Sequence, residues 1–202
     1  MATHPLVLAS GSPRRRMLLH MAGFNIAKVS PPDIPEIRQP EERPIAYCRR
    51  LSLEKASAVL AHNAWILAAD TIVHLGEQIF EKPQSDAHAE QMLATLSGQW
   101  HQVTSAWCLR WSGPAAAPTA PKTIFRGHQT SRVKFRPLTT AEIRRYIDTG
   151  EGRDKAGAYA IQGDGSALIS RVVGSTTNVV GLPLEAVIDK LFIAGVTRGI
   201  HK

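Results

Sequence analysis

Apolar residues in this chain form short continuous runs and stripes at helical spacing, and the two patterns alternate along the sequence. Continuous runs over residues 6–9 and 65–73 are typical of strands that are covered on both faces. Apolar stripes at helical spacing follow Pro44, Ser85 and Thr139, so helices are expected there, and the stripe after Ser85 occupies i, i+3, i+4 and i+7. Strands interspersed with helices predict an α/β fold.

Turn signals add detail to this α/β arrangement. A hairpin at Gly76 implies antiparallel pairing and therefore a mixed central sheet with flanking helices. Residues 112–123, rich in proline and alanine, predict a surface loop inside a single domain over residues 1–202. Further strands are expected over residues 25–30, 100–111, 126–135, 168–173 and 178–180, and further helices after Pro13 and Pro183. The helix after Pro13 is expected to bury Met17, Leu18, Met21 and Ala22, and the helix after Pro44 to end near His62.

Composition narrows the class of protein. The chain has 202 residues, of which 44% are hydrophobic and 20% charged, as in an ordinary globular protein. The formal charge of +7 favours anionic partners. Cys48 and Cys108 do not form a C-x-x-C pair, which argues against a disulfide framework or a zinc site. Without a signal-like or membrane-length apolar run, the sequence predicts a cytoplasmic protein and no membrane partner.

The turn after the first strand has the residues of an anion-binding site. In the segment Ser10-Gly11-Ser12-Pro13-Arg14-Arg15, Ser12 can cap a helix and Pro13 can take its first position. The helix N-terminus and the two arginines then place positive charge and N–H donors at the turn. Ser-Pro is also an ordinary helix start and arginines are usually solvated, so the motif alone leaves both interpretations open.

Two charged residues interrupt apolar patterns. Asp70, followed by Thr71, interrupts a central strand close to its expected end, where a carboxylate needs a partner, a metal or a cleft. Function is therefore favoured at Asp70. Lys55 lies on the buried stripe of the helix that starts at Pro44, and it either packs its stem while the ammonium reaches solvent or enters a polar cleft. The pattern leaves these two alternatives open.

A set of polar residues lacks a structural explanation and fits nucleotide chemistry. Cations and hydroxyls can bind a polyphosphate, two acids can hold a divalent metal and activate water, and an amide can recognise a base edge. The set is Ser10, Arg14, Arg15, Glu36, Lys55, Asp70, Lys82, Lys155 and Gln162. Neither a P-loop nor a Rossmann fingerprint is present in the sequence.

Several motifs occur in order along almost the whole chain, and together they make a family resemblance specific. The sequence resembles the Maf family of nucleoside triphosphate pyrophosphatases. The motifs that carry the resemblance are Ala9-Ser10-Gly11-Ser12-Pro13-Arg14-Arg15, Ala69-Asp70-Thr71, Glu81-Lys82-Pro83, Leu96-Ser97-Gly98 with His101, Asp154-Lys155-Ala156-Gly157-Ala158-Tyr159, Ile161-Gln162-Gly163 and Val179-Val180-Gly181-Leu182-Pro183-Leu184.

The resemblance implies a fold, a reaction and a cofactor. The implied fold is a two-lobed α/β structure like that of the inosine triphosphate pyrophosphatases, with the active site in the cleft between the lobes and often in a homodimer. The implied reaction cleaves between the α- and β-phosphates to give a monophosphate and pyrophosphate, with Mg²⁺ or Mn²⁺ as the divalent metal. The Ser-Pro-Arg-Arg and Ile-Gln-Gly forms are similar to the branch that prefers dTTP and UTP.

The resemblance also implies a role for each matching residue. Asp70 would be the general base, and Glu36 would help Asp70 to hold the metal. Ser10, Arg14, Arg15, Lys55 and Lys82 would bind phosphate, and Lys155 would line the same cleft. Arg14, Thr71 and Gln162 would correspond to positions associated with base preference.

Two alternative functions remain at this stage. One is a house-cleaning pyrophosphatase that acts on modified nucleotides. The other is a regulatory protein that senses nucleotides or binds nucleic acid without turnover. Nucleic acid is disfavoured as a partner, because the arginine clusters are not interleaved with exposed aromatic residues.

Overall fold

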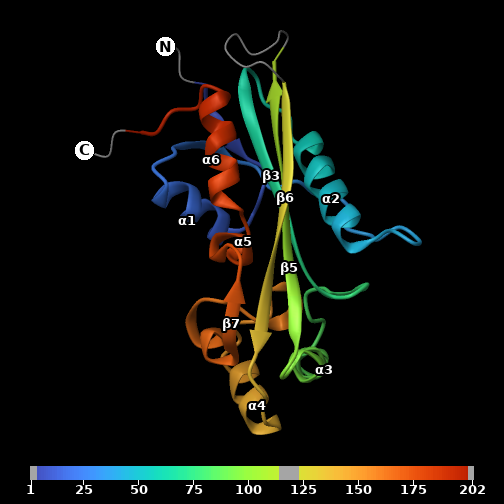
Figure 1. Ribbon diagram of the computed structural model, residues 1–202. Coiled ribbons are helices and arrows are strands. Elements are labelled where there is room, and N and C mark those ends of the chain that lie inside the picture. Colours follow the sequence, from blue (N-terminus) through green and yellow to red (C-terminus); the bar gives the residue numbers. More distant parts are fainter. Residues whose placement is uncertain (1–3, 114–122, 200–202) are drawn as a thin grey trace. The chain divides into compact units, whose positions relative to one another are not determined.

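The protein is described here by a computed structural model, which covers residues 4–113 and 123–199. A seven-stranded mixed sheet has the strand order β2-β1-β3-β5-β6-β7, with β4 paired to β3 (Figure 1). The mixed sheet with flanking helices confirms the predicted fold class, whereas the surface loop expected over residues 112–123 lies largely outside the described residues. The strands are β1 (Leu6–Leu8), β2 (Ile26–Val29), β3 (Ala64–Leu75), β4 (Gln78–Phe80), β5 (Trp100–Ser112), β6 (Ile124–Phe135) and β7 (Ile169–Val173).

The helices begin at or next to the capping residues that the sequence indicates. They are α1 (Pro13–Met21), α2 (Pro44–Ala58), α3 (Asp86–Leu96), α4 (Thr140–Asp148), α5 (Thr176–Val180) and α6 (Leu184–Ile193), together with the 3₁₀ turns η1 (Ala156–Ala158) and η2 (Gly163–Leu168). Thr139 and Glu142 form the expected capping box of α4. Within the described part of the chain, no helix combines the length and the apolar character needed to cross a membrane.

The chain divides into two compact units, and each is described separately. The first unit contains Met1–Asp70, Ser105–Gln129 and Gly181–Lys202. The second unit contains Thr71–Thr104 and Thr130–Val180. Strands β3, β5 and β6 contribute residues to both units, so the division does not follow the borders of the secondary-structure elements.

In the first unit, β1 pairs in parallel with both β2 and β3. Helices α1 and α6 cover one face of this part of the sheet and α2 covers the other (Figure 1). All of β1 is buried, as its continuous apolar run predicts. Between α2 and the sheet, Ala56, Val59 and Ile66 belong to one apolar cluster, which fixes the face that α2 turns toward β3.

Helix α1 begins as expected but buries a different face. Ser12 is its N-cap, Pro13 is its first residue, and Gly23 takes the left-handed conformation after its last turn with φ at +83°. The expected apolar face is wrong, because Met21 is 76% exposed and Leu19 is buried instead of Met17. Two consecutive leucines face the sheet here, and the methionines lie outside that contact.

The structure corrects two further expectations. Residues 178–180 belong to the short helix α5 and not to a strand, since the Ser175 hydroxyl accepts a hydrogen bond from the backbone N–H of Asn178 (3.2 Å) and begins a helical turn. Helix α2, which was expected to end near His62, ends four residues earlier, at Ala58. The Arg110 guanidinium donates to the carbonyl oxygen of Val59 (3.2 Å), which satisfies a carbonyl that the helix leaves free.

The second unit has its own core, which includes Leu93 and Leu96 of α3 and Phe135 of β6. The rings of His101, Phe135 and Tyr159 pack edge to face, with centroid separations of 4.8–5.4 Å. His101 Nε2 lies 2.8 Å from the Tyr159 hydroxyl, while His101 Nδ1 is buried and unpartnered among the described residues. Burial, with a smaller contribution from His74, lowers the pKa of His101 to about 4.

Because the His101 imidazole is buried, we expect the free energy of unfolding to decrease in acid. The folded protein keeps His101 neutral down to about pH 4, whereas the unfolded chain protonates it below its ordinary pKa of 6.5. The free energy of unfolding therefore falls as the pH decreases through this window, by about 3 kcal/mol in total. Urea unfolding of wild type and His101→Leu at pH 7, 5.5 and 4.5 measures this contribution. The variant is expected to lose less stability than wild type between pH 7 and 4.5, and equal losses would contradict the assignment.

Candidate active site

The first unit contains a cluster in which one lysine contacts two carboxylates. Lys55 Nζ lies 2.6 Å from Asp70 Oδ1 and 2.8 Å from Glu36 Oε2. Lys55 and Asp70 are buried, whereas half of the Glu36 side chain is exposed. A buried carboxylate and a buried ammonium are tolerated when each neutralises the other. The cluster therefore places two acids and one base at one point, open to solvent on the Glu36 side.

Helix α2 positions Lys55 through the residues one and two turns before it. Cys48 and Leu51 share its buried stripe, and the Cys48 Sγ lies 3.4 Å from the backbone carbonyl oxygen of Asp70. This contact joins α2 directly to the strand position that carries the acid. Of the two alternatives for Lys55, the structure therefore selects the one in which its ammonium binds inside the protein.

The position of Asp70 differs from the expectation. It was predicted at the end of a strand, but β3 continues to Leu75, so Asp70 lies within the strand. The polar residues Asp70 and Thr71 do not end the strand, because Asp70 has Lys55 as its counter-ion and Thr71 is half-buried. A polar interruption in an apolar run thus marks a paired position here and not a strand end.

The Ser10–Arg15 turn lies in the same unit and is internally hydrogen-bonded. The Ser10 hydroxyl accepts from Arg15 Nη1 (2.9 Å) and from the backbone N–H of Ser12 (3.2 Å). Arg15 Nε donates to the carbonyl oxygen of Gly181 (2.9 Å). Burial lowers the pKa of Arg15, while the nearby Asp70 carboxylate acts in the opposite direction. Arg15 is thus held by fixed partners within electrostatic reach of Asp70, and Arg14 precedes it on the first turn of α1.

The remaining predicted residues lie in the second unit, which the structure describes separately. The backbone N–H of Gly157 donates to the carbonyl oxygen of Glu81 (3.1 Å), which joins the segment that carries Lys155 to the one that carries Lys82. Gly157 has φ at +73°, and a Cβ on it would lie 3.0 Å from the Val73 side chain, so a glycine is required there. Lys82 and Gln162 are exposed and Lys155 is half-buried.

Glu36 and Asp70 are the acids that can hold a metal ion. Across the described residues, His, Cys, Asp and Glu nowhere form a group of three or more suited to a metal. Mg²⁺ is usually bound by only one or two carboxylates together with substrate phosphates, so a larger group is not required. Two hard oxygen donors that already share one cation fit that kind of site.

Sequence reasoning missed Tyr47, which holds the Glu36 loop. Its hydroxyl donates to the backbone carbonyl oxygen of Glu36 (2.8 Å), and its side chain is buried. Tyr47, Leu51 and Lys55 are spaced by four residues on α2, a spacing that places them on one helix face. This four-residue spacing is the feature of the sequence that could have identified Tyr47.

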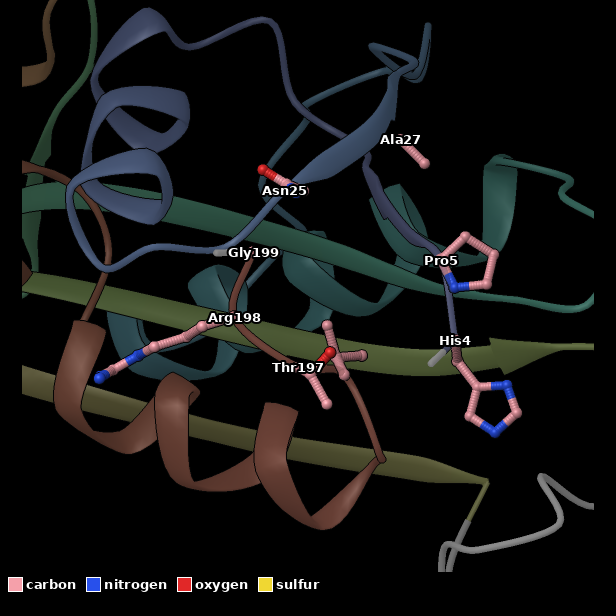
Figure 2. A pocket seen from close by; sticks show the side chains of 8 residues that line it. His4, Pro5, Asn25, Ala27, Thr197, Arg198 and Gly199 are labelled. Carbon is pink, nitrogen blue, oxygen red and sulfur yellow. The ribbon is translucent and has the colours of Figure 1, made fainter. Parts of the chain in front are cut away.

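A hollow of about 360 Å³ occurs elsewhere in the first unit (Figure 2). It is lined by His4, Pro5, Asn25, Ala27, Val196, Thr197, Arg198 and Gly199. None of the predicted site residues contributes to this lining. The Arg198 guanidinium lies over the rings of Phe24 and Phe192, with centroid distances of 5.9 and 5.4 Å, so aromatic packing accounts for this cation.

The fold and the site together define a class: a mixed α/β protein with a carboxylate–lysine cluster and an arginine–serine turn, a combination suited to the chemistry of phosphates. A family model described as "Maf-like protein" matches residues 5–192. The chain belongs to this family.

Relatives in this family cover nearly the whole chain. A dTTP/UTP pyrophosphatase of Alcanivorax borkumensis is 43% identical over 92% of this chain and 93% of its own length. Proteins with the same name in Myxococcus xanthus and Rhizobium meliloti are 44% and 41% identical, each over 94% of this chain and 92% of their own lengths. A solved structure of a HAM1 protein from Coxiella burnetii aligns with a TM-score of 0.43 at 12% identity, over 97% of this chain and 94% of that chain.

Because Lys55 is the counter-ion of two carboxylates, we expect its loss to destabilise the protein more than the loss of one carboxylate. Lys55→Met leaves the buried Asp70 and its neighbour Glu36 without their shared cation and should lower the free energy of unfolding by about 3 kcal/mol. Asp70→Asn leaves Lys55 paired with Glu36 and should cost less than about half as much. Urea unfolding at pH 7 compares the two variants. Equal losses, or the reverse order, would show that the shared contact does not control stability.

Proposed function

We propose that this protein hydrolyses nucleoside triphosphates to the monophosphate and pyrophosphate, with dTTP and UTP as preferred substrates. The observation that carries the proposal is the Lys55 contact with both Asp70 and Glu36, beside an arginine that is bonded to Ser10. The relatives named dTTP/UTP pyrophosphatase, at 41–44% identity over most of this chain, support the choice of substrates.

The proposed mechanism uses Asp70 as the general base. Asp70 takes a proton from the attacking water, and the ammonium of Lys55, 2.6 Å away, holds the carboxylate in place. Ser10, Arg14 and Arg15 bind phosphate oxygens at the N-terminus of α1, where positive charge offsets the charge that develops in the transition state. Thr71, Lys82, Lys155 and Gln162 are assigned to the same substrate, with Arg14, Thr71 and Gln162 responsible for base preference.

Lys55 has a second proposed task, which is to bind phosphate. Its ammonium already contacts two carboxylates, so a phosphate oxygen has to share that ammonium or replace one of them. Glu36 is the carboxylate more easily replaced, because half of its side chain is exposed.

A divalent metal, Mg²⁺ or Mn²⁺, completes the proposal. Glu36 and Asp70 would hold it, and their oxygens are the donors that such ions prefer. When bound, the metal neutralises phosphate charge and makes a coordinated water more acidic. A homodimer and a cytoplasmic location are further predictions from the sequence, and sedimentation of the purified chain would test the first of them.

The substrate proposal is tested by pyrophosphate release from a panel of triphosphates with Mg²⁺ or Mn²⁺. We expect kcat/KM to be highest for dTTP and UTP, and Asp70→Asn to lower kcat by roughly two to four orders of magnitude with little change in dTTP affinity. The matched control is Asp189→Asn, the same chemical change at an exposed position on α6, which should leave turnover unchanged.

Each alternative gives a different result in this experiment. Highest kcat/KM on modified nucleotides would indicate a house-cleaning enzyme. Nucleotide binding without pyrophosphate release would indicate a sensor. Wild-type turnover in Asp70→Asn would remove Asp70 from the mechanism.

Metal dependence gives a separate prediction. EDTA should abolish pyrophosphate release, and Mg²⁺ or Mn²⁺ should restore it. Glu36→Gln should raise the metal concentration needed for half-maximal activity by roughly tenfold, which corresponds to about 1.4 kcal/mol of lost binding free energy. The comparison uses kcat at saturating metal, where the variant should approach wild type. An unchanged metal requirement would exclude Glu36 as a ligand.

A further inference from the structure

The segment that carries Gln162 is attached on both sides to two side chains that have no role in the proposed mechanism. Before Gln162, the backbone N–H of Ala160 donates to the Tyr146 hydroxyl (3.0 Å). After it, the Glu151 carboxylate accepts hydrogen bonds from the backbone N–H groups of Gly165 (2.8 Å) and Asp164 (3.2 Å). Only three residues, 161–163, lie between these two attachments, so Gln162 has little freedom to move.

Tyr146 and Glu151 hold the two ends of the same short segment, and we call this pair of residues the Tyr146–Glu151 clamp. Burial raises the pKa of the Tyr146 hydroxyl, and the nearby Glu151 carboxylate raises it further. Tyr146 is buried at the end of α4 and packs into the core of the second unit, so the hydroxyl is fixed by that core. The Tyr146 hydroxyl thus holds the backbone at Ala160, and the Glu151 carboxylate holds it at Gly165.

Glycines make room for the clamp at the positions where backbone approaches it closely. A Cβ at Gly163 would lie 1.9 Å from Glu151 Oε1, and a Cβ at Gly165 would lie 2.9 Å from the Tyr146 hydroxyl. Gly163 also has φ at +69°, which disfavours other residues. The backbone that follows Gln162 is therefore shaped around these two side chains.

The clamp also reaches the segment that carries Lys155. Lys155 Nζ donates to the backbone carbonyl oxygen of Glu151 and lies 2.5 Å from Asp154 Oδ1. One residue, Glu151, thus contacts Lys155, which is assigned to the substrate cleft, through its backbone, and the segment assigned to the base through its side chain. A shift of Glu151 would move both.

We propose that Tyr146 and Glu151 are positioning residues that set nucleobase selectivity by fixing the backbone on both sides of Gln162. This inference rests on the proposed function, which assigns Gln162 to base preference. A side-chain amide discriminates between bases only when its donor and acceptor are held in a fixed place, since a mobile amide adapts to several base edges. Loss of the clamp therefore reduces discrimination more than it reduces the chemical step.

The test compares Tyr146→Phe and Glu151→Gln with wild type. The first removes the acceptor of the Ala160 N–H, and the second replaces one carboxylate oxygen by an amide group that cannot accept. The matched control is Ser97→Ala, which removes another hydroxyl of the second unit that accepts from a loop backbone N–H, that of Leu138 at 2.8 Å. Equilibrium binding of dTTP and dGTP, and pyrophosphate release from both, are measured for each protein.

We expect each clamp variant to lower the ratio of dTTP to dGTP affinity roughly fivefold to tenfold, the effect of one lost hydrogen bond to a buried or charged group. KM for dTTP should rise while kcat changes less than about twofold. The double variant should lose little more than either single variant, because both residues hold the same short segment. Ser97→Ala should keep the wild-type ratio even if it lowers Tm.

Three results overturn the inference: an unchanged affinity ratio in both folded clamp variants, an equal change in Ser97→Ala, or a wild type that does not discriminate between the two nucleotides. Selective binding by wild type without pyrophosphate release would refute the proposed function, and the affinity ratios of the variants would still decide the role of the clamp.

Discussion

The arrangement of the first unit depends on the buried ammonium of Lys55. Taking an ammonium and a carboxylate out of water costs several kcal/mol for each ion, so neither Lys55 nor Asp70 is tolerated in this place alone. The stripe of α2 must therefore face β3 with Lys55 opposite Asp70, and the Cys48 contact with the Asp70 carbonyl fixes the same alignment. Helix α2 therefore packs on β3 only in the arrangement that also forms the charged cluster.

The second unit places its residues by a different physical means. Lys155 and Gln162 lie on irregular backbone, where no helix or strand determines their direction. Their position comes from hydrogen bonds to the Tyr146–Glu151 clamp and from glycines that let the backbone approach it. Charge pairing thus organises the acid and base groups, whereas backbone hydrogen bonding organises the loop proposed to recognise the base.

The sequence predicted helices and strands correctly where a single hydrophobic period or a local capping motif marked the segment. It failed where the structure depends on contacts between particular side chains. The continuous apolar run of β3 and the capping box of α4 were confirmed, because each is a local signal. Residues 178–180 were misassigned, since an apolar run of that length fits a strand or a helical turn equally, and the Ser175 cap decides between them. Periodicity placed Lys55 on the buried stripe but could not name its carboxylate partners, which lie 15 and 19 residues away in the chain.

The charge balance of the cluster explains why a polyanionic substrate would need more than these residues. Lys55 carries one positive charge against the two carboxylates of Glu36 and Asp70, so the three side chains together are negative. Arg15 only restores neutrality, and its guanidinium is bonded to Ser10 and Gly181. A triphosphate therefore meets no net attraction from this group alone. Under the proposed function, the missing positive charge has to come from Arg14 and Lys82, from the N-terminus of α1 and from a divalent metal that the two acids would hold. The same balance explains why two acids can approach one point, because the ammonium of Lys55 offsets part of their mutual repulsion.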